Sequence, residues 1–237
     1  MKTAILVGGK GMRLHEFTKE MPKALVQIGG KPILWHIMKI YAAQGFTDFV
    51  LCMGYYGEQI KEHFENNNPE NWKIEYIDTG LESNKAERLR QIKKYMDGEE
   101  NFFVAYGDDV SDVDIRKVLE FHKQKKKVAT LTTVNPPSQF GTLRCDMLSG
   151  AVIEFEEKPK IKDQWINGGF FVFNKKIFDY LHRVKGELEG EVFTALAKDE
   201  ELVAYRHSGF WGCMNNFKEW SELDELWKSR KAPWKKW

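Results

Sequence analysis

The stretch AILVGGKGMRL, residues 4–14, decides the fold. Its first four residues form a short apolar run that leads directly into glycines, which is typical of a buried strand entering a tight turn. Comparable runs recur through the first half of the chain, and most contain β-branched or aromatic residues, which favour strands. We therefore predict further strands at residues 46–53, 73–77, 101–106 and 128–134.

Helical periodicity fills the gaps between these runs. Apolar residues recur at helical spacing in residues 32–45, 57–66, 87–96 and 114–125. Strands that alternate with helices indicate a Rossmann-like α/β fold, in which a mostly parallel mixed sheet carries helices on both faces. In such sheets ligands bind at the carboxyl ends of the strands. The residues that follow each predicted strand are therefore the first candidates for a functional site.

The pattern changes after Pro136, where short strand-like pieces, turns and one helix replace the regular alternation. The pieces lie at residues 141–145, 151–155, 169–173 and 202–205. We expect them to add α+β decoration to the same sheet, within one domain that spans residues 1–237. The basic tail KSRKAPWKKW is expected to be a solvated end with Trp234 and Trp237 docked on a neighbouring element, although polybasic runs can also bind nucleic acid.

Composition excludes several classes of protein. Hydrophobic residues make up 42% of the 237, which supplies a sizeable core, and no segment approaches the roughly 18 consecutive apolar residues of a membrane helix. The first apolar run is too short for a signal peptide, so we expect a cytoplasmic location. The three widely spaced cysteines favour reduced thiols over a disulfide framework or a zinc site. A formal charge of +1 predicts no nucleic acid or membrane partner, so local groups must hold any anionic ligand.

The glycine-rich turn at Gly8, Gly9 and Gly11 is the first candidate binding element. Small residues let backbone N–H groups approach a phosphate chain, and nearby cations such as Arg13 and Lys23 can offset its charge. The spacing fits neither the GxGxxG of dinucleotide folds nor the P-loop pattern. On these residues alone, a purely structural tight turn stays open as the alternative.

Two stretches together resemble a known family. GGKGMRL (8–14) followed by PKALVQIGGKPILWHI (22–37) is similar to the N-terminal signature of sugar nucleotidyltransferases. Four further stretches resemble one branch of this family, the glucose-1-phosphate cytidylyltransferases, in the same order and over nearly the whole chain. They are YGDDVSDVDI (106–115), FEEKPK (155–160), INGGFFVFN (166–174) and HSGFWGCM (207–214). The resemblance implies a glycosyltransferase-A-like fold. Its nucleotide-binding part would cover about 1–135, its sugar-phosphate-binding part about 136–220, and its C-terminal helix and tail 216–237.

The resemblance also implies a reaction. A nucleoside triphosphate, CTP for this branch, and a sugar 1-phosphate, α-D-glucose 1-phosphate, would give a nucleotide-sugar for polysaccharide biosynthesis and release pyrophosphate. The sugar phosphate attacks the α-phosphorus in line, so the protein chiefly positions two anions and stabilises spreading charge. The resemblance assigns catalytic roles to Arg13, against the triphosphate and leaving pyrophosphate, and to Lys23, between the α-phosphate and the incoming sugar phosphate. The family often forms homo-oligomers, which we expect here.

Binding residues follow from the same resemblance. Nucleotide contacts are expected from Leu6, Gly8, Gly9, Gly11, Met12, Arg13, Lys23, Arg88 and Gly107. Contacts to the sugar phosphate are expected from Tyr106, Glu157, Lys158, Asn167 and Gly168. For Glu157 and Lys158, the residues alone would equally fit an ordinary charged turn.

Asp108 follows a predicted strand and can hold a divalent cation at the carboxyl edge of the sheet. Magnesium commonly takes one or two carboxylates and fills its other positions with phosphate oxygens and water. The resemblance makes Asp108 the metal-binding aspartate and Mg²⁺ the cofactor, with Asn215 at the second metal position. Asp109 is left open between metal binding and helix capping, whereas Asp112 is expected to cap the helix that follows.

Three features depart from the family pattern. Asn215 stands where cytidylyltransferases have an aspartate, Met12 replaces a threonine, and KAERL at residues 85–89 stands where Thr-Gly-Gly-Arg-Leu is expected. The leading hypothesis is a metal-dependent glucose-1-phosphate cytidylyltransferase. The first alternative is the same reaction with another base or another phosphorylated acceptor. The second is a nucleotide- or sugar-phosphate-binding protein that has lost catalysis, because Asn215 brings no charge.

Overall fold

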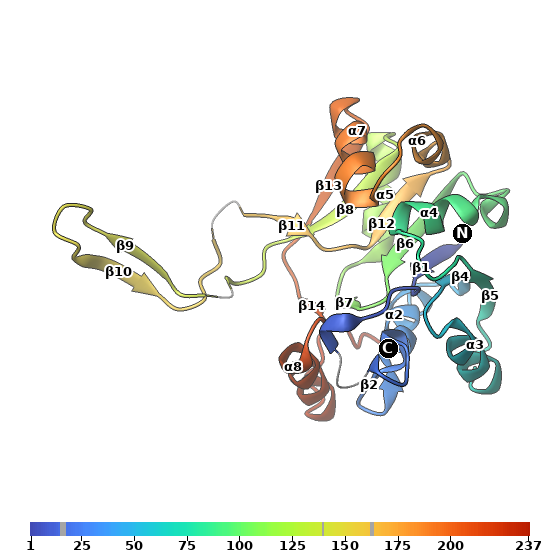
Figure 1. The fold of residues 1–237 in the computed structure, drawn as a ribbon, viewed down its shortest axis with the longest axis horizontal. Coiled ribbons are helices and arrows are strands. Elements are labelled where there is room, and N and C mark those ends of the chain that lie inside the picture. The colour runs from blue at the N-terminus through green and yellow to red at the C-terminus, as the bar shows by residue number, and fades with distance from the viewer. Residues whose placement is uncertain (15–17, 139, 162–163) are drawn as a thin grey trace.

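Strand β1 (Thr3–Leu6) lies inside a mixed eight-stranded sheet in the computed structural model, which describes every residue except 15–17, 139 and 162–163 (Figure 1). All four residues of β1 are buried, because neighbouring strands pair with both of its edges and side chains cover both of its faces. The other strands of the sheet are β4 (Asp48–Met53), β5 (Lys73–Asp78), β6 (Asn101–Tyr106), β8 (Ala129–Val134), β11 (Ile166–Asn167), β12 (Phe171–Asn174) and β13 (Leu202–His207). Their order is β11–β8–β12–β6–β1–β4–β5, with β13 paired to β8.

The strand directions agree with the predicted alternation. Strands β1, β4, β5 and β6 are parallel, whereas β12 runs antiparallel to both β6 and β8. Strand β13 pairs parallel with β8 through its whole length. The predicted fold class, a mostly parallel mixed sheet of the α/β type, is therefore confirmed.

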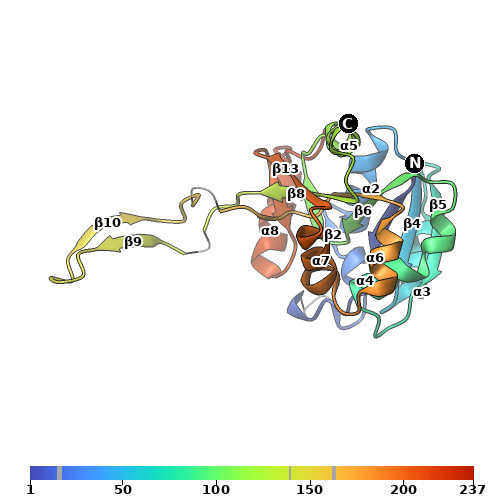
Figure 2. The ribbon, with the colours of Figure 1, turned by 90° about the horizontal axis from the view of Figure 1, so that it is seen from above.

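Helices cover both faces of the sheet (Figure 2). They are α2 (Ile33–Ala42), α3 (Gly57–Asn66), α4 (Lys85–Gln91), α5 (Ile115–Lys125), α6 (Ile177–Arg183), α7 (Phe193–Lys198) and α8 (Phe217–Lys228). Helices α2, α3, α5 and α8 share one hydrophobic core, and α4, α6 and α7 share the other. Side chains alternate across a strand, so Ile5 of β1 enters the first core while Ala4 and Leu6 enter the second.

The helix predicted at residues 87–96 is wrong at its boundaries. The structure has α4 at Lys85–Gln91 and a separate 3₁₀ turn, η3 (Lys93–Met96). Helix α4 begins early because Asn84 forms a capping box: its side chain accepts the Glu87 N–H, and the Glu87 carboxylate accepts the Asn84 N–H.

The prediction that Asp112 caps the next helix is also wrong. Asp114 caps α5 instead, by accepting the backbone N–H groups of Arg116 and Lys117. The Asp112 carboxylate accepts the Phe210 N–H at 2.7 Å and pairs with His207 at 2.9 Å. Asp112 therefore joins the segment after β6 to the segment before α8.

The tail packs as expected. Trp234 is 1% exposed within the core that contains α2, and its indole N–H points to His36 Nδ1 at 3.4 Å. Trp237 packs against the same core from a partly buried position. The docking of both tryptophans on a neighbouring element is confirmed.

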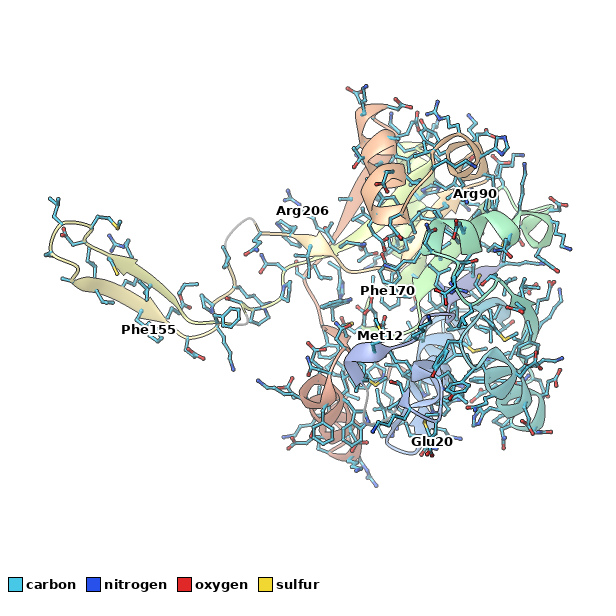
Figure 3. All side chains as sticks on the ribbon, viewed as in Figure 1. Met12, Glu20, Arg90, Phe155, Phe170 and Arg206 are labelled. Carbon is cyan, nitrogen blue, oxygen red and sulfur yellow. The ribbon has the colours of Figure 1, made fainter. Side chains whose placement is uncertain are left out.

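The pieces expected as decoration of the sheet divide into two groups. Strands β12 and β13 do join the main sheet, together with β11, which was not predicted, but β9 (Thr142–Cys145) and β10 (Val152–Glu156) form a separate antiparallel hairpin. This hairpin, which we call the arm, projects far from the rest of the molecule, with side chains on both of its faces (Figures 1 and 3). The expectation that both strands add to the main sheet is wrong, because each pairs only with the other.

Short elements connect these strands and helices. They are η1 (Met12–Leu14), η2 (Lys23–Leu25), β2 (Gln27–Ile28), β3 (Lys31–Pro32), β7 (Asp109–Ser111), η4 (Leu188–Val192) and β14 (Trp211–Cys213). Strands β7 and β14 form a small antiparallel ladder, which brings the segment before α8 next to the end of β6. None of the helices in the described part of the chain is long and apolar enough to span a membrane.

Candidate active site

A cleft of about 630 Å³ lies at the carboxyl ends of β1 and β6. The chain that follows each of these two strands lines it. The predicted site residues along its walls are Leu6, Gly8, Gly9, Gly11, Met12, Lys23, Arg88, Tyr106, Gly107, Asp108, Asn167 and Asn215. The structure thus brings residues predicted for nucleotide, substrate and metal binding into one place.

Lys23 and Asp108 meet across this cleft. Lys23 begins the 3₁₀ turn η2 directly after Pro22, and Asp108 follows β6. The Lys23 ammonium lies 2.5 Å from Asp108 Oδ2, and both side chains are mostly shielded from solvent, at 15% and 26% exposed. A cation and a carboxylate in such a partly dry cleft interact more strongly than on an open surface. The contact fixes the ammonium at the carboxyl edge of the sheet.

Asp109 lies beside Asp108 but is almost completely buried, at 4% exposed. The register of the β7–β14 ladder places it directly opposite Cys213. Burial, and then the negative charge of Asp108, raises the pKa of the Asp109 carboxyl well above its usual range. Burial also raises the pKa of the Cys213 thiol, and the two carboxylates add to that effect.

Asn215 lines the cleft, and its side chain contacts the sulfur atom of Cys213. Its amide donates to Cys213 Sγ at 2.9 Å, and its backbone N–H donates to the Glu219 carboxylate at 2.7 Å. Among the described histidines, cysteines, aspartates and glutamates, ligand atoms of Asp108, Asp109 and Cys213 lie within 4.8 Å of one another. The role predicted for Asn215 at the metal stays a prediction.

Arg88 forms a hydrogen bond with the glycine turn. Its guanidinium, 4% exposed, donates to the backbone oxygens of Gly8, Met53 and Gly80 and to the Thr79 hydroxyl, over 2.7 to 3.0 Å. A Cβ at Gly8 would collide with this guanidinium, so the turn requires glycine there. Arg88 therefore positions the turn and borders the cleft at the same time.

Tyr106 also lines the cleft, where two hydrogen bonds hold its hydroxyl group. Its hydroxyl donates to Glu189 Oε1 at 2.5 Å and accepts a hydrogen bond from the Asn167 amide at 2.9 Å. The Lys85 ammonium pairs with the same Glu189 carboxylate and lies 4.5 Å from the centre of the Tyr106 ring. Burial and the neighbouring Glu189 charge raise the pKa of Tyr106, so its hydroxyl keeps its proton.

Sequence reasoning did not identify Lys85 or Glu189 as part of this network. Lys85 had a signal, because it stands in the segment that departs from the family pattern. Glu189 had none, because only the folding of η4 against α4 brings it to Tyr106. Both now count among the candidate site residues.

The glycine pair after β11 approaches the site closely. Gly168 donates its N–H to Thr132 and accepts the Trp211 indole N–H at 3.0 Å, so it faces away from the open cleft. Gly169 has a φ of 73°, and a Cβ there would lie 3.1 Å from Asp109 Oδ2 and 3.2 Å from the Tyr106 ring. The turn therefore needs glycine to pass this near to Asp109.

Three predicted residues, Gly168, Glu157 and Lys158, do not line the cleft. Glu157 and Lys158 are exposed at the base of the arm, where Pro159 accepts the Ser138 N–H at 2.8 Å. The backbone of Arg13 belongs to η1, but its side chain lies outside what the structure describes. The roles of these four residues stay predictions.

A second cavity, of about 570 Å³, lies at the opposite edge of the sheet. Lysines and carboxylates line it together with the ion pair between Arg183 and Asp199, whose atoms lie 2.6 Å apart. It contains no glycine turn and no pair of adjacent carboxylates among its described residues. The cleft at the carboxyl edge is therefore the better candidate for chemistry on anionic substrates.

The cleft combines the parts that phosphoryl chemistry needs. A glycine turn offers close backbone approach, Lys23 offers a cation, and adjacent carboxylates offer oxygen ligands for a metal. A reaction that displaces pyrophosphate depends on positioning and charge stabilisation more than on a protein nucleophile.

Sequence comparison places these residues in a family. The model of the family described as "Nucleotidyl transferase" matches residues 2–225. The glucose-1-phosphate cytidylyltransferase of Salmonella typhimurium is 42% identical over 258 aligned positions that cover 100% of both chains. The mannose-1-phosphate guanyltransferase beta-A of Xenopus laevis is 31% identical over 216 positions, which cover 89% of this chain and 60% of that one.

Structural comparison agrees at the level of the fold. HddC from Yersinia pseudotuberculosis superposes with a TM-score of 0.72 at 23% identity, over 95% of this chain and 99% of that one. The superposition therefore shows a shared fold.

Proposed function

Since this chain belongs to the nucleotidyl transferase family, we propose that it joins CTP to α-D-glucose 1-phosphate, forming CDP-glucose and releasing pyrophosphate. The observation that carries the proposal is the 42% identity with a glucose-1-phosphate cytidylyltransferase over the full length of both chains. The cleft agrees with it, because a glycine turn, Lys23 and Asp108 meet there.

The triphosphate binds on the turn from Gly8 to Gly11 in this proposal. Arg88 supports the turn through the Gly8 carbonyl, and Met12 borders the same wall. Arg13 offsets the charge of the leaving pyrophosphate, and Lys23 bridges the α-phosphate and the sugar phosphate. The Asp108 carboxylate holds Lys23 at 2.5 Å before substrate arrives. A phosphate that takes over this ammonium frees the carboxylate for a metal.

The sugar phosphate binds toward Tyr106, Asn167 and the Gly168 turn. The Tyr106 and Asn167 side chains are already joined by a hydrogen bond of 2.9 Å, so they are fixed before the sugar binds. We also retain Glu157 and Lys158 as proposed acceptor residues, although they lie on the arm. For these two residues to contact the sugar phosphate, the arm must be held in a fixed position relative to the cleft in the working enzyme.

A divalent metal, with Mg²⁺ as the proposed ion, completes the site. The donor set fits, because Asp108 and its neighbours offer the oxygen ligands that such cations take. When bound, the ion neutralises charge on the phosphates and makes pyrophosphate a better leaving group. The protein's part is Asp108 as a ligand and Lys23 as the movable cation.

A homo-oligomer is proposed as the working form. The arm exposes large apolar side chains, among them Leu143 at 58%, Met147 at 92% and Phe155 at 62%. A lone two-stranded hairpin is marginal in water, and contiguous exposed apolar surface marks an interaction site. A cytoplasmic location and a role in polysaccharide biosynthesis remain part of the same proposal.

Pyrophosphate release tests the proposed function. Purified protein is assayed with CTP, UTP, dTTP and GTP against glucose 1-phosphate, mannose 1-phosphate and galactose 1-phosphate, with magnesium present. We expect CTP with glucose 1-phosphate to give the highest kcat/KM. A different preferred pair would favour the altered-specificity alternative, which the unusual segment at residues 85–89 motivates. Tight CTP binding by calorimetry without turnover in any pair would favour the non-catalytic binding protein.

A further inference from the structure

Lys85 lines the cleft from the first turn of α4. It lies three residues before Arg88, so the two side chains share one face of the helix. Arg88 donates to the Gly8 carbonyl, which fixes that face against the glycine turn. The capping box between Asn84 and Glu87 fixes the residue at which the helix begins. The position of Lys85 at the cleft is therefore set by its neighbours and does not depend on its own ion pair.

Glu189 meets Lys85 from η4. The Lys85 ammonium pairs with Glu189 Oε1, the same oxygen that accepts the Tyr106 hydroxyl, and it lies 4.5 Å from the centre of the Tyr106 ring. Glu189 stands in a single turn of π-helix, a rare form that occurs frequently at functional sites. The Lys85 side chain is 45% exposed and the Glu189 side chain 31%, so a ligand can reach the pair.

This ion pair can be exchanged for a stronger one. A pair of lysine and glutamate that is open to solvent contributes little to stability. A phosphate monoester carries roughly two negative charges and three acceptor oxygens, whereas a carboxylate carries one charge. An ammonium that can reach both groups therefore prefers the phosphate.

The other cations of the cleft are already committed. Among the described lysines and arginines, those that line the cleft are Lys10, Lys23, Lys85 and Arg88. The guanidinium of Arg88 is saturated by backbone oxygens, and Lys10 pairs with the exposed Glu82. Lys85 contacts Tyr106, on the side where the sugar phosphate binds in the proposed function. Lys158, in contrast, lies on the arm.

Lys85 and Lys23 act on neighbouring points of one wall. Lys23 pairs with Asp108, and Lys85 lies over Tyr106. These two wall residues are two positions apart in the chain, so their Cα atoms are separated by at most about 7 Å. The proposed reaction brings two anionic substrates together, and one ammonium offsets only part of their charge. A second ammonium beside the first suits the incoming phosphate.

We propose that Lys85 binds the phosphate of the sugar phosphate, and that Glu189 holds its ammonium over the Tyr106 ring until that phosphate arrives. The ammonium then exchanges the carboxylate for the phosphate, while Tyr106 keeps its hydrogen bond to Glu189. Threonine, which the family pattern has in place of Lys85, offers only a neutral hydroxyl. The inference rests on the proposed function for the identity of the acceptor.

Calorimetry tests the phosphate contact without turnover. Glucose 1-phosphate is titrated into the full chain saturated with magnesium and α,β-methylene-CTP, which cannot release pyrophosphate. We expect Lys85→Met to raise the Kd for glucose 1-phosphate at least about tenfold and the Kd for the CTP analogue less than about twofold, because a charged hydrogen bond is lost on the acceptor side only. Lys85→Arg, which keeps the charge, should restore most of the affinity.

Lys175→Met is the matched control for Lys85→Met. It also removes an exposed ion pair between lysine and glutamate, with Glu100, but it lies outside the cleft. It should leave both Kd values unchanged. Circular dichroism and thermal melting establish that each variant is folded.

Glu189→Gln separates phosphate binding from a structural ion pair. Glutamine keeps an acceptor for the Tyr106 hydroxyl but removes the charge that competes for Lys85. With inorganic phosphate as the probe and the CTP analogue bound, Glu189→Gln should bind phosphate about threefold more tightly than the wild type, as the loss of an exposed competing pair allows. Lys85→Met should bind it more weakly. A pair that only joins α4 to η4 would make both variants bind more weakly.

Three results would overturn the inference. They are an unchanged Kd for glucose 1-phosphate in folded Lys85→Met, an equal loss of affinity for the CTP analogue, and weaker phosphate binding in Glu189→Gln. Failure of the proposed function is distinguishable from these. A protein that binds glucose 1-phosphate through Lys85 but forms no product would lose the proposed function and keep this site. An enzyme whose Lys85→Met variant retains the KM for glucose 1-phosphate would keep the function and lose the site.

Discussion

At the residue scale, the contact between Lys23 and Asp108 links the first loop to the end of β6. We expect Lys23→Ala to lower kcat at least about a hundredfold, because it removes one group that stabilises charge in the transition state. Folding should change little, since the side chain borders the cleft and belongs to neither hydrophobic core. Pyrophosphate-release kinetics measure the effect. Lys31→Ala, which removes an exposed lysine from β3 outside the cleft, is the control.

One result would contradict the role predicted for Lys23. A Lys23→Ala enzyme with near-normal kcat would mean that the ammonium only neutralises Asp108. In that case Asp108→Asn, which removes the need for neutralisation, should be equally harmless.

Arg88 makes a different prediction, because its guanidinium is buried and serves backbone oxygens. Arg88→Ala leaves several of those acceptors without partners, and we expect a loss of about 2–4 kcal/mol in the free energy of unfolding. The KM for CTP should rise as well, because the Gly8 carbonyl loses its support. Urea denaturation and steady-state kinetics measure the two effects. Arg144→Ala is the control, because it removes only an exposed ion pair with Glu154 on the arm. It should change the free energy of unfolding by less than about 0.5 kcal/mol.

Two buried histidines make stability depend on pH. Burial lowers the pKa of both His36 and His122 from 6.5 to about 4. The unfolded chain therefore takes up the proton first, so this stability is fully present above pH 6.5 and is lost as the pH falls toward 4. Each shift corresponds to about 3 kcal/mol at most.

His122→Gln should flatten that dependence. Its ring contacts Thr130 and Asn101, and glutamine keeps a hydrogen-bonding side chain without a titrating group. Unfolding free energies from pH 7.5 to 4 should fall less steeply in the variant than in the wild type. His182→Gln, at an exposed position, should follow the wild-type curve. Parallel curves for His122→Gln and the wild type would show that acid sensitivity comes from other groups.

At the scale of elements, η4 and the start of α4 meet over Tyr106 through Glu189 and Lys85. Glu189→Ala removes the acceptor of the Tyr106 hydroxyl and leaves Lys85 without its partner. We expect a several-fold or larger rise in KM for glucose 1-phosphate, with little change in KM for CTP, because only the sugar side is disturbed. Glu191→Ala in the same turn is the control, since Glu191 accepts the Glu187 N–H instead. Equal effects on both substrates would mean that the network supports the whole cleft.

The elements also show what the sequence could and could not predict. Buried strands such as β1 and β6 are visible in the sequence as apolar runs, so the position of Asp108 directly after β6 was predictable. Asp109 and Cys213 carry no such signal, because only the β7–β14 register makes them neighbours. The arm was missed for a related reason: strands β9 and β10 look like any short strand, and nothing local shows that their partner is not the main sheet.

At the scale of the whole molecule, the arm makes the chain asymmetric and leaves apolar surface without a cover. All residues of β10 are exposed, and they include Val152, Ile153 and Phe155. A stable interface of standard size buries about 800 Å² on each partner, which an extended hairpin of this kind can supply from both of its faces. We therefore expect the wild type to run as a homo-oligomer in light-scattering chromatography.

Replacing the outward apolar residues of the arm tests this. The double variant Ile153→Asp, Phe155→Asp should be monomeric, because a charge at a buried interface costs far more than any contact that it could replace. Its melting temperature should stay close to that of a monomer with an intact core, since both side chains lie outside the hydrophobic clusters. Lys160→Asp, an exposed charge near the arm's base, should leave the assembly intact. If the wild type is monomeric at micromolar concentration, the arm must cover itself against another part of the same chain, and the double variant would then lose stability instead of assembly.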